Sequence, residues 1–259
     1  MSQERTIAGG FGGPAGVGQG ASRPHAGGDP SGPPIAIDAR GVRKVFGKGA
    51  LAFEALKGVD FQVGLGEFVM LAGPSGSGKT TLLSILGCVL SPTAGQVRLL
   101  DEHIERLPES ELPRIRTEYI GFIFQGHNLL ASLTAEQNVA LQLELRGVES
   151  EPALVEARAL LAKVGLADKV GRKPMELSGG QRQRVSIARA LAGSPPVILA
   201  DEPTAALDAE NGRLVTEILR ELARERGTTV VVVTHDNRIF HLADRIVHIE
   251  DGLIQDNPS

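Results

Sequence analysis

A glycine-rich segment followed by a lysine and two threonines is the part of this sequence best suited to chemistry. The pattern G-x-x-x-x-G-K-[ST] fits residues 73–80 without a mismatch, between the apolar run 68–72 and helical-looking residues 82–86. Glycines let successive backbone N–H groups turn toward an anion, and the start of the next helix adds unpaired N–H groups and partial positive charge. The segment therefore predicts a phosphate-binding loop for a nucleotide, and the plainer alternative is an ordinary turn before a helix.

Backbone and side chains divide the predicted binding between them. Lys79 supplies a full positive charge for the β- and γ-phosphates, and the Thr80 hydroxyl is predicted to hold Mg²⁺. The residues expected around the phosphates are Gly73, Pro74, Ser75, Gly76, Ser77, Gly78, Lys79, Thr80 and Thr81.

Two acidic residues after a buried strand are the candidates for metal binding and for catalysis. The apolar residues 197–200 are followed at once by Asp201 and Glu202. In an open α/β sheet, ligands bind at the carboxyl ends of the strands. Asp201 is placed to hold Mg²⁺, and Glu202 is a candidate general base for an attacking water. The pattern is informative because a phosphate-binding loop precedes it in the same chain.

A second serine–glycine segment, residues 177–181, opens another predicted helix. Ser178 is a favourable N-cap, so free N–H groups at this helix start form a second potential anion site. The plainer interpretation is an ordinary capped helix. One nucleotide does not need two such sites from one chain, whereas two copies facing head to tail would use both.

Composition restricts the possible classes of protein. The chain has 259 residues, a net charge of −4 and no basic run, which argues against a nucleic-acid partner. Its single cysteine, Cys88, rules out an intrachain disulfide and a cysteine metal cluster. No apolar run approaches the roughly 18 residues that span a bilayer, and no hydrophobic signal segment begins the chain. We therefore expect a soluble, cytoplasmic protein that would serve a membrane only through a partner chain.

The chain divides into a tail, one large domain and a short C-terminal end. Residues 1–34 contain ten glycines and five prolines, a composition that predicts disorder. A strand from residue 35, extended by 42–46, and the runs 53–56 and 59–63 predict a small antiparallel sheet, and residues 126–192 predict a helical insert. From residue 197, strands alternate with helices, which indicates a parallel sheet. The predicted fold is α/β, with one domain over 35–255, and residues 256–259 form the end.

The run Leu177–Gln181 resembles the signature motif of ABC-type ATPases. Other motifs of that family occur in its order over about residues 35–255. The matching positions are Phe46 for adenine stacking, Gln125 for the glutamine loop, Asp201 and Glu202 for the Walker B pair, residues 205–208 for the D-loop, and His235 for the switch histidine. Ala205 is a departure, because the family more often has glycine or serine there.

The resemblance implies a P-loop NTPase core and an ATP-driven clamp between two copies of the chain. ATP with Mg²⁺ would bind the phosphate loop of one copy, and the second copy would close over it with Ser178, Gly179, Gly180, Gln181 and Asp208. Glu202 would activate water, and His235 would contact the γ-phosphate. Gln125 would contact Mg²⁺ and connect the site to residues 126–145, which would bear on a membrane partner.

A more specific resemblance points to a branch of the family. The domain is similar to ATPases of macrolide exporters and lipoprotein-releasing systems, and residues 124–130 and 133–139 are especially similar to DevA-like ATPases of glycolipid exporters. This resemblance implies an integral membrane permease and a place on the cytoplasmic face of the inner membrane, and it allows a periplasmic adaptor as a further partner. It favours export of a lipid or lipophilic compound.

Three other functions stay open at this point. The chain could serve an importer, or act as a soluble, non-transport ABC ATPase on DNA or the ribosome. Such soluble proteins usually carry long coiled coils or two ATPase domains, and this sequence has neither. A small-molecule P-loop kinase has no use for the run at residues 177–181.

Overall fold

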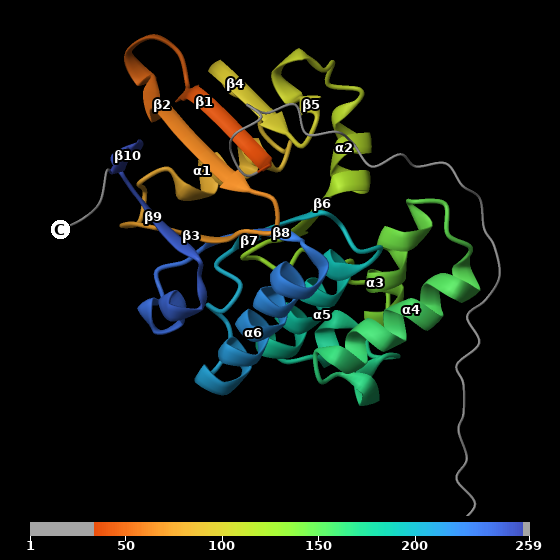
Figure 1. Cartoon of the computed structure of the whole chain (residues 1–259). Coiled ribbons are helices and arrows are strands. Elements are labelled where there is room, and N and C mark those ends of the chain that lie inside the picture. The colour runs from red at the N-terminus through yellow and green to blue at the C-terminus, as the bar shows by residue number, and fades with distance from the viewer. Residues whose placement is uncertain (1–33, 256–259) are drawn as a thin grey trace, which may run out of the picture.

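The structure, a computed structural model, describes residues 34–255. The predicted tail up to residue 33 and the C-terminal end at 256–259 lie outside the described residues. An antiparallel sheet of four strands lies above a sheet of six strands, and most of the helices lie below and beside the larger sheet (Figure 1). The smaller sheet has the order β2-β1-β4-β5 and consists of β1 (Ile35–Phe46), β2 (Phe53–Gly64), β4 (Ala94–Leu99) and β5 (Glu102–His103).

The six-stranded sheet has the order β10-β9-β3-β8-β7-β6 and is parallel except for β10. Its strands are β3 (Phe68–Ala72), β6 (Ile120–Ile123), β7 (Val197–Asp201), β8 (Thr229–Val233), β9 (Arg245–Glu250) and β10 (Leu253–Gln255). Every residue of β3, β7 and β8 is buried, because both faces of a parallel sheet are covered. In register, Val233 of β8 lies beside Leu71 and Asp201, so β3, β7 and β8 end at one edge.

Alternating side chains of this sheet separate two hydrophobic cores. Val69 and Leu71 face the antiparallel sheet and helix α1, whereas Phe68 and Met70 face the larger group of helices. The α-helices are α1 (Lys79–Leu86), α2 (Leu112–Tyr119), α3 (Ala135–Glu144), α4 (Ser150–Lys163), α5 (Gly179–Leu191) and α6 (Ala209–Arg226). Helices α3, α4 and α5 pack on one another and form the helical subdomain.

The predicted fold class is confirmed, with differences in single elements. The runs expected at 53–56 and 59–63 are one strand, β2, which continues through Gly58 at a φ of +97°. The short helix expected near 238–243 is a 3₁₀ helix, Asn237–Leu242. Helix α2 was not predicted, because it has only eight residues and only Ile115 is fully buried, while Leu112 and Tyr119 are partly buried.

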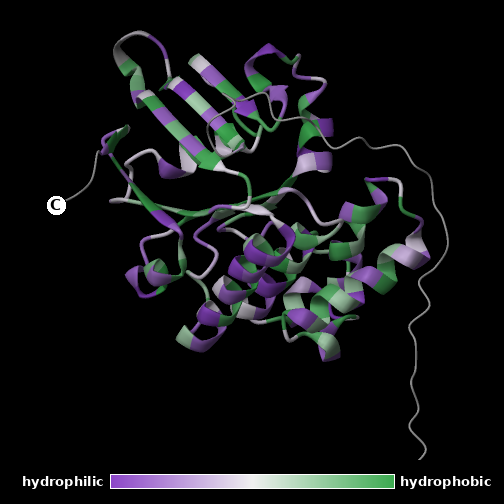
Figure 2. Ribbon diagram, viewed as in Figure 1, coloured by the Kyte–Doolittle hydropathy of each residue, from purple (hydrophilic) through white to green (hydrophobic). Residues whose placement is uncertain are grey.

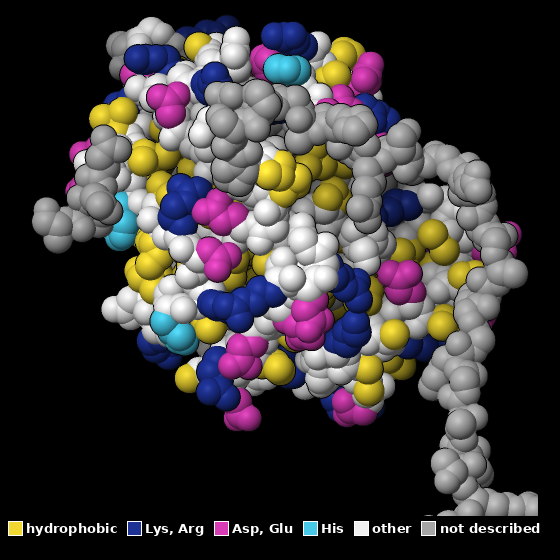
Figure 3. Space-filling view, in the orientation of Figure 1, with side chains coloured by type: hydrophobic (Ala, Val, Ile, Leu, Met, Phe, Trp, Pro, Cys, Tyr) yellow, Lys and Arg dark blue, Asp and Glu magenta, His cyan; other side chains and the backbone are white. Residues whose placement is uncertain are grey.

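The interior of the protein is hydrophobic and its surface is mixed in hydropathy and charge. Figure 2 shows the strands of the six-stranded sheet largely in the hydrophobic colour, while the outer helices carry alternating colours. On the face shown in Figure 3, acidic and basic side chains are intermixed over the lower part of the molecule, where α6 lies in Figure 1. Within α6, Arg213 and Glu217 form one such pair, which is an exposed contact of small energetic weight.

Candidate nucleotide-binding site

A cleft of about 660 Å³ lies where the glycine-rich loop leaves β3 and enters α1. It is open at the edge where β3, β7 and β8 end, which is the expected ligand edge of such a sheet. The described residues that line it are Phe46, Phe53, Ala55, Gly73, Pro74, Ser75, Gly76, Ser77, Gly78, Lys79, Thr80, Thr81, Gln125, Glu202, Val233 and His235. Predicted positions from five separate parts of the sequence therefore meet in one cleft.

Three glycines give the phosphate loop its shape, two of them through close packing and one through open space. A Cβ on Gly73 would lie 2.0 Å from the Ile249 carbonyl oxygen, and one on Gly78 would lie 2.7 Å from that of Ala55. Both residues also have positive φ, so packing and backbone conformation each require glycine there. Gly76 has a φ of +78° and nothing within 4 Å of a built Cβ, so it faces open space where a phosphate would fit.

Lys79 lies over this loop and is largely buried. Its ammonium group donates hydrogen bonds to the carbonyl oxygens of Gly73 (2.8 Å) and Pro74 (2.7 Å). Burial lowers the pKa of Lys79, while the nearby charges of Glu202 and Asp201 act in the opposite direction. The lysine is thus held at the mouth of the loop, where a phosphate can replace weak carbonyl partners with a charged one.

Thr80 and Asp201 form the part of the site that fits a divalent cation. The Thr80 hydroxyl donates to the Asp201 carboxylate across 3.2 Å, joining the start of α1 to the end of β7. Burial raises the pKa of Asp201, and the hydrogen bond from Thr80 opposes that effect. Hard oxygen ligands of this type suit Mg²⁺, which usually binds through one or two protein groups together with substrate phosphates. Within residues 34–255, no group of three or more His, Cys, Asp or Glu side chains is arranged to hold a metal ion.

Glu202 and His235 approach each other at the far side of the cleft. The His235 Nδ1 atom lies 2.8 Å from the Glu202 carboxylate, whose side chain is 12% exposed against 74% for the histidine. Glu202 has a φ of +49°, an uncommon backbone conformation for a residue with a side chain. Its N–H donates to the Val233 carbonyl at 2.9 Å, which anchors the turn. Strained backbone fixed by β8 therefore aims the carboxylate into the cleft.

Two phenylalanines mark the opposite end of the cleft. Phe46 and Phe53 are register partners at the ends of β1 and β2, and their side chains are exposed. The Lys44 ammonium lies 5.3 Å from the centre of the Phe46 ring. Sequence reasoning identified Phe46 but missed Phe53, Ala55 and Val233. Phe53 is recognisable only once the pairing of β1 with β2 is known.

Replacing Phe46 with alanine should weaken ATP binding if this ring stacks on adenine. Base–aromatic stacking contributes about 1–3 kcal/mol, so the Kd is expected to rise at least about 5-fold. Phe53→Ala is the matched control, and titration of both variants with ATP under non-hydrolysing conditions measures the effect. A rise for Phe53→Ala alone would assign the stacking surface to Phe53 instead.

The serine–glycine turn lies elsewhere on the chain. None of the described residues that line the cleft comes from 178–181, and Asp208 is absent from it too. Ser178 and Gln181 form a reciprocal capping box at the start of α5, with hydrogen bonds of 3.2 and 2.9 Å. A Cβ on Gly180 would lie 3.2 Å from Leu207, so this turn packs beside the predicted D-loop.

Asp208 has a local structural role in this conformation. Its carboxylate accepts hydrogen bonds from the backbone and side chain of Asn211, at 2.9 and 2.7 Å, and so caps α6. The hydrogen bonds from Asn211 lower the pKa of Asp208. The structure thus brings together the loop, Gln125, Glu202 and His235, and leaves the turn and Asp208 on a separate surface.

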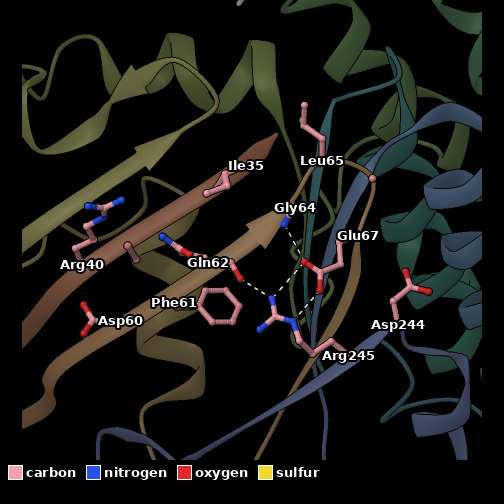
Figure 4. Close-up of a pocket in the computed structure, with 12 residues that line it drawn as sticks. Ile35, Arg40, Asp60, Phe61, Gln62, Gly64, Leu65, Glu67, Asp244 and Arg245 are labelled. Atoms are coloured by element: carbon pink, nitrogen blue, oxygen red, sulfur yellow. Dashed lines mark hydrogen bonds and ion pairs between the residues drawn. The ribbon is translucent and has the colours of Figure 1, made fainter. Parts of the chain in front are cut away.

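A larger hollow of about 1040 Å³ lies away from this site, between β2 and the start of β9 (Figure 4). Arg245 crosses it and hydrogen-bonds to Glu67 at 2.7 Å and to the Gln62 carbonyl oxygen at 2.5 Å. Glu67 also accepts from the Gly64 N–H at 2.8 Å. Arg245, Glu67 and the Gln62 carbonyl thus have hydrogen-bond partners within the chain, and Arg245 of β9 is joined to β2. These polar groups therefore need no ligand to complete their hydrogen bonds.

A phosphate loop between β3 and α1, with an acidic pair at the end of β7, defines a P-loop nucleotide-binding protein. The model of the family described as ABC transporter matches residues 56–205, and the chain belongs to this family. It is an ABC ATPase cassette.

Two export proteins are similar to most of this chain. It is 47% identical over 217 residues to the macrolide export ATP-binding/permease protein MacB of Salmonella typhimurium, a match of 84% of this chain and 33% of the relative. MacB of Escherichia coli (strain K12) is 45% identical over 222 residues, with 86% and 34% covered. The chain thus spans about a third of the length of these relatives.

Solved structures match over nearly their whole length. A dimeric post-hydrolysis state of the ATP-binding cassette MJ0796, bound to ADP and Pi, has a TM-score of 0.83 and 41% identity, and the match covers 86% of this chain and 98% of that chain. Another dimeric structure of the same bacterial ABC transporter cassette has a TM-score of 0.82 and 42% identity, covering 85% and 97%. None of the helices within residues 34–255 combines the length and apolar character needed to cross a bilayer.

Proposed function

We propose that this chain binds and hydrolyses ATP as a head-to-tail dimer and powers transport through a separate membrane permease. The main support for this proposal is that the two anion-binding segments of the chain lie in different places. The cleft holds a phosphate loop, a metal-binding pair and a candidate base, whereas the second anion-binding turn at Ser178 lies outside it. A second copy is the natural source of the missing half, so each closed dimer would hold two nucleotides.

Each residue then has a defined part in phosphoryl transfer. Lys79 and the N–H groups at the start of α1 bind the phosphates, and Thr80 and Asp201 would hold Mg²⁺, which neutralises developing charge when bound. Glu202 accepts the proton of the attacking water, and His235 beside it contacts the γ-phosphate and helps to place that water. Gln125 approaches from the loop after β6. Positioning and charge neutralisation account for most catalysis of this kind.

The permease is proposed to dock in a groove between the core and the helical subdomain. The groove holds about 340 Å³ and is lined by residues that include Phe122, Phe124 and Leu145. Leu145 is 62% exposed and Val89, at the rim, is 52% exposed. This groove continues directly from the Gln125 loop, so a partner seated there could respond to nucleotide bound in the cleft.

Export is the favoured direction because the named relatives are macrolide export proteins. The closer likeness to DevA-like glycolipid-exporter ATPases stays a prediction, as does a lipid or lipophilic cargo. An importer subunit is the alternative within the same class. The proposed location is the cytoplasmic face of the inner membrane, where the permease would hold the chain. A periplasmic adaptor would be a further partner of the same complex.

The test is isolation of the chain from native membranes with an affinity tag. An integral membrane protein is expected to co-purify, and the complex should release inorganic phosphate from ATP. Charge reversal in the groove, Arg116→Glu, should reduce recovery of the membrane protein, while Arg213→Glu on the outer face of α6 serves as the control. Recovery of nucleic acid or ribosomes in place of a membrane protein would contradict the transport role.

A further inference from the structure

Helix α5 carries the serine–glycine turn at one end and reaches the loop after Gln125 with its other end. The Arg189 guanidinium donates to the carbonyl oxygens of Asn128 (2.6 Å) and His127 (3.0 Å), which are about sixty positions away in the sequence. The planar fork of an arginine suits two acceptors at once. One side chain therefore joins the two segments that the proposed dimer site requires.

The two residues held by Arg189 have an unusual backbone. His127 and Asn128 both have positive φ, +64° and +49°, so two consecutive residues with side chains are left-handed. Such a conformation persists only where surrounding contacts impose it. The same turn includes the residues next to Gln125. The His127 N–H donates to the Phe124 carbonyl, and the Asn128 N–H donates to the Gly126 carbonyl.

Arg189 is a cation without an acidic partner. Burial lowers the pKa of its guanidinium, and it forms no ion pair within the part of the chain that the structure describes. The side chain is partly buried, and removing a charge from water is costly unless its hydrogen bonds are made. Gln183, six residues earlier on the same helix, also lies beside His127, whereas Arg189 bonds the carbonyl oxygens of both His127 and Asn128. Arg189 is therefore the side chain of α5 that holds residues 127 and 128 in place.

The far half of the loop is fixed to a different helix. Asn138 of α3 donates to the carbonyls of Leu130, Leu133 and Thr134, and its own oxygen accepts from the Leu130 N–H at 2.8 Å. Asn138 is fully buried, so these bonds are shielded from water. With residues 130–134 tied to α3, the freedom that remains in the loop lies between Gln125 and residue 128, where Arg189 acts.

We propose that Arg189 is a positioning residue that sets the approach of Gln125 to the nucleotide and ties it to the serine–glycine turn through α5. This inference rests on the proposed function, because it assigns Gln125 a part in ATP hydrolysis. Arg189 does not touch the nucleotide. It acts by holding the carbonyls of residues 127 and 128, so that a shift of α5 moves Gln125 as well.

The test is a double-mutant cycle in the full chain. Arg189→Met is expected to lower the kcat for ATP hydrolysis about 10-fold and to leave KM within 2-fold. In a Gln125→Ala background, the same substitution should lower kcat by less than 2-fold, because the group that it positions is already gone. Arg184→Met is the matched control, since Arg184 lies on the same helix and donates to the Val164 carbonyl at 3.1 Å. Its effect should be the same in both backgrounds.

A second measurement keeps the proposal testable apart from catalysis. Amide hydrogen exchange at residues 126–130, without nucleotide, should rise at least 10-fold in Arg189→Met and stay unchanged in Arg184→Met. Arg189→Lys keeps the cation but loses the fork, and it should give a smaller rise. Equal kcat losses in both backgrounds, or unchanged exchange, would overturn the role of Arg189. A parent chain without ATP turnover would count against the proposed function, and the exchange result would still decide on Arg189.

Discussion

Glu202→Gln should abolish ATP turnover while leaving ATP binding intact. The Glu202 carboxylate lies in the cleft with His235 at 2.8 Å, and its backbone is anchored to Val233. The amide keeps the size of the side chain but cannot accept a proton from water. General-base catalysis contributes about 10²–10⁴-fold to a rate, so kcat should fall by that factor. The measurement is phosphate release at saturating Mg-ATP, with ATP affinity determined by titration.

The same variant should accumulate an ATP-bound dimer. If ATP closes two copies and hydrolysis opens them, blocking hydrolysis traps the closed state. Size-exclusion chromatography with light scattering should show a dimer in Mg-ATP and a monomer in Mg-ADP. Glu250→Gln, a carboxylate outside the cleft at the end of β9, is the control and should behave as the parent. If Glu202→Gln hydrolyses ATP at the parental rate, Glu202 is not the general base. If it stays a monomer in Mg-ATP, ATP does not drive dimerisation.

The parallel core could be predicted because its signals are local. Residues 197–200 and 230–233 are apolar throughout, as strands buried on both faces must be, and the structure has strands there. The cap at Ser178 was equally readable, because a capping box depends on side chains three residues apart. By contrast, Leu253–Gln255 forms a three-residue edge strand that exists only by pairing with β9, and no local pattern marks it.

The candidate site shows where sequence reasoning stops. The residue pattern identified the phosphate loop, Asp201 and Glu202, the family resemblance added His235, and the fold brings them to one sheet edge. The left-handed backbone at Glu202, however, arises from the contact with Val233 and is not encoded by residue type. The bonds of Arg189 to residues 127 and 128 depend likewise on how α5 packs against the loop. Long-range contacts of this kind follow from tertiary packing, which one sequence does not reveal.

Lys79→Ala should weaken ATP binding strongly, because the variant loses the positive charge that faces the phosphates. A hydrogen bond to a charged group contributes about 1.5–3 kcal/mol, which corresponds to a rise of about 10- to 150-fold in Kd. Lys79 also ties the loop together through the carbonyls of Gly73 and Pro74. The loop should therefore become more mobile in the free protein, and this loss of preorganisation acts in the same direction.

Titration with ATP and Mg²⁺, followed by calorimetry or a fluorescent nucleotide, measures this effect. Lys57→Ala on β2 is the control, because it removes an exposed lysine outside the cleft. Lys79→Arg separates the two contributions: it restores charge but not the compact geometry that reaches both carbonyls, so its Kd should lie between those of the parent and the alanine variant. If Lys79→Ala and Lys79→Arg both bind ATP with the parental Kd, as the control Lys57→Ala should, the glycine-rich loop is not the phosphate site. The roles proposed for Thr80 and Asp201 would then be wrong as well.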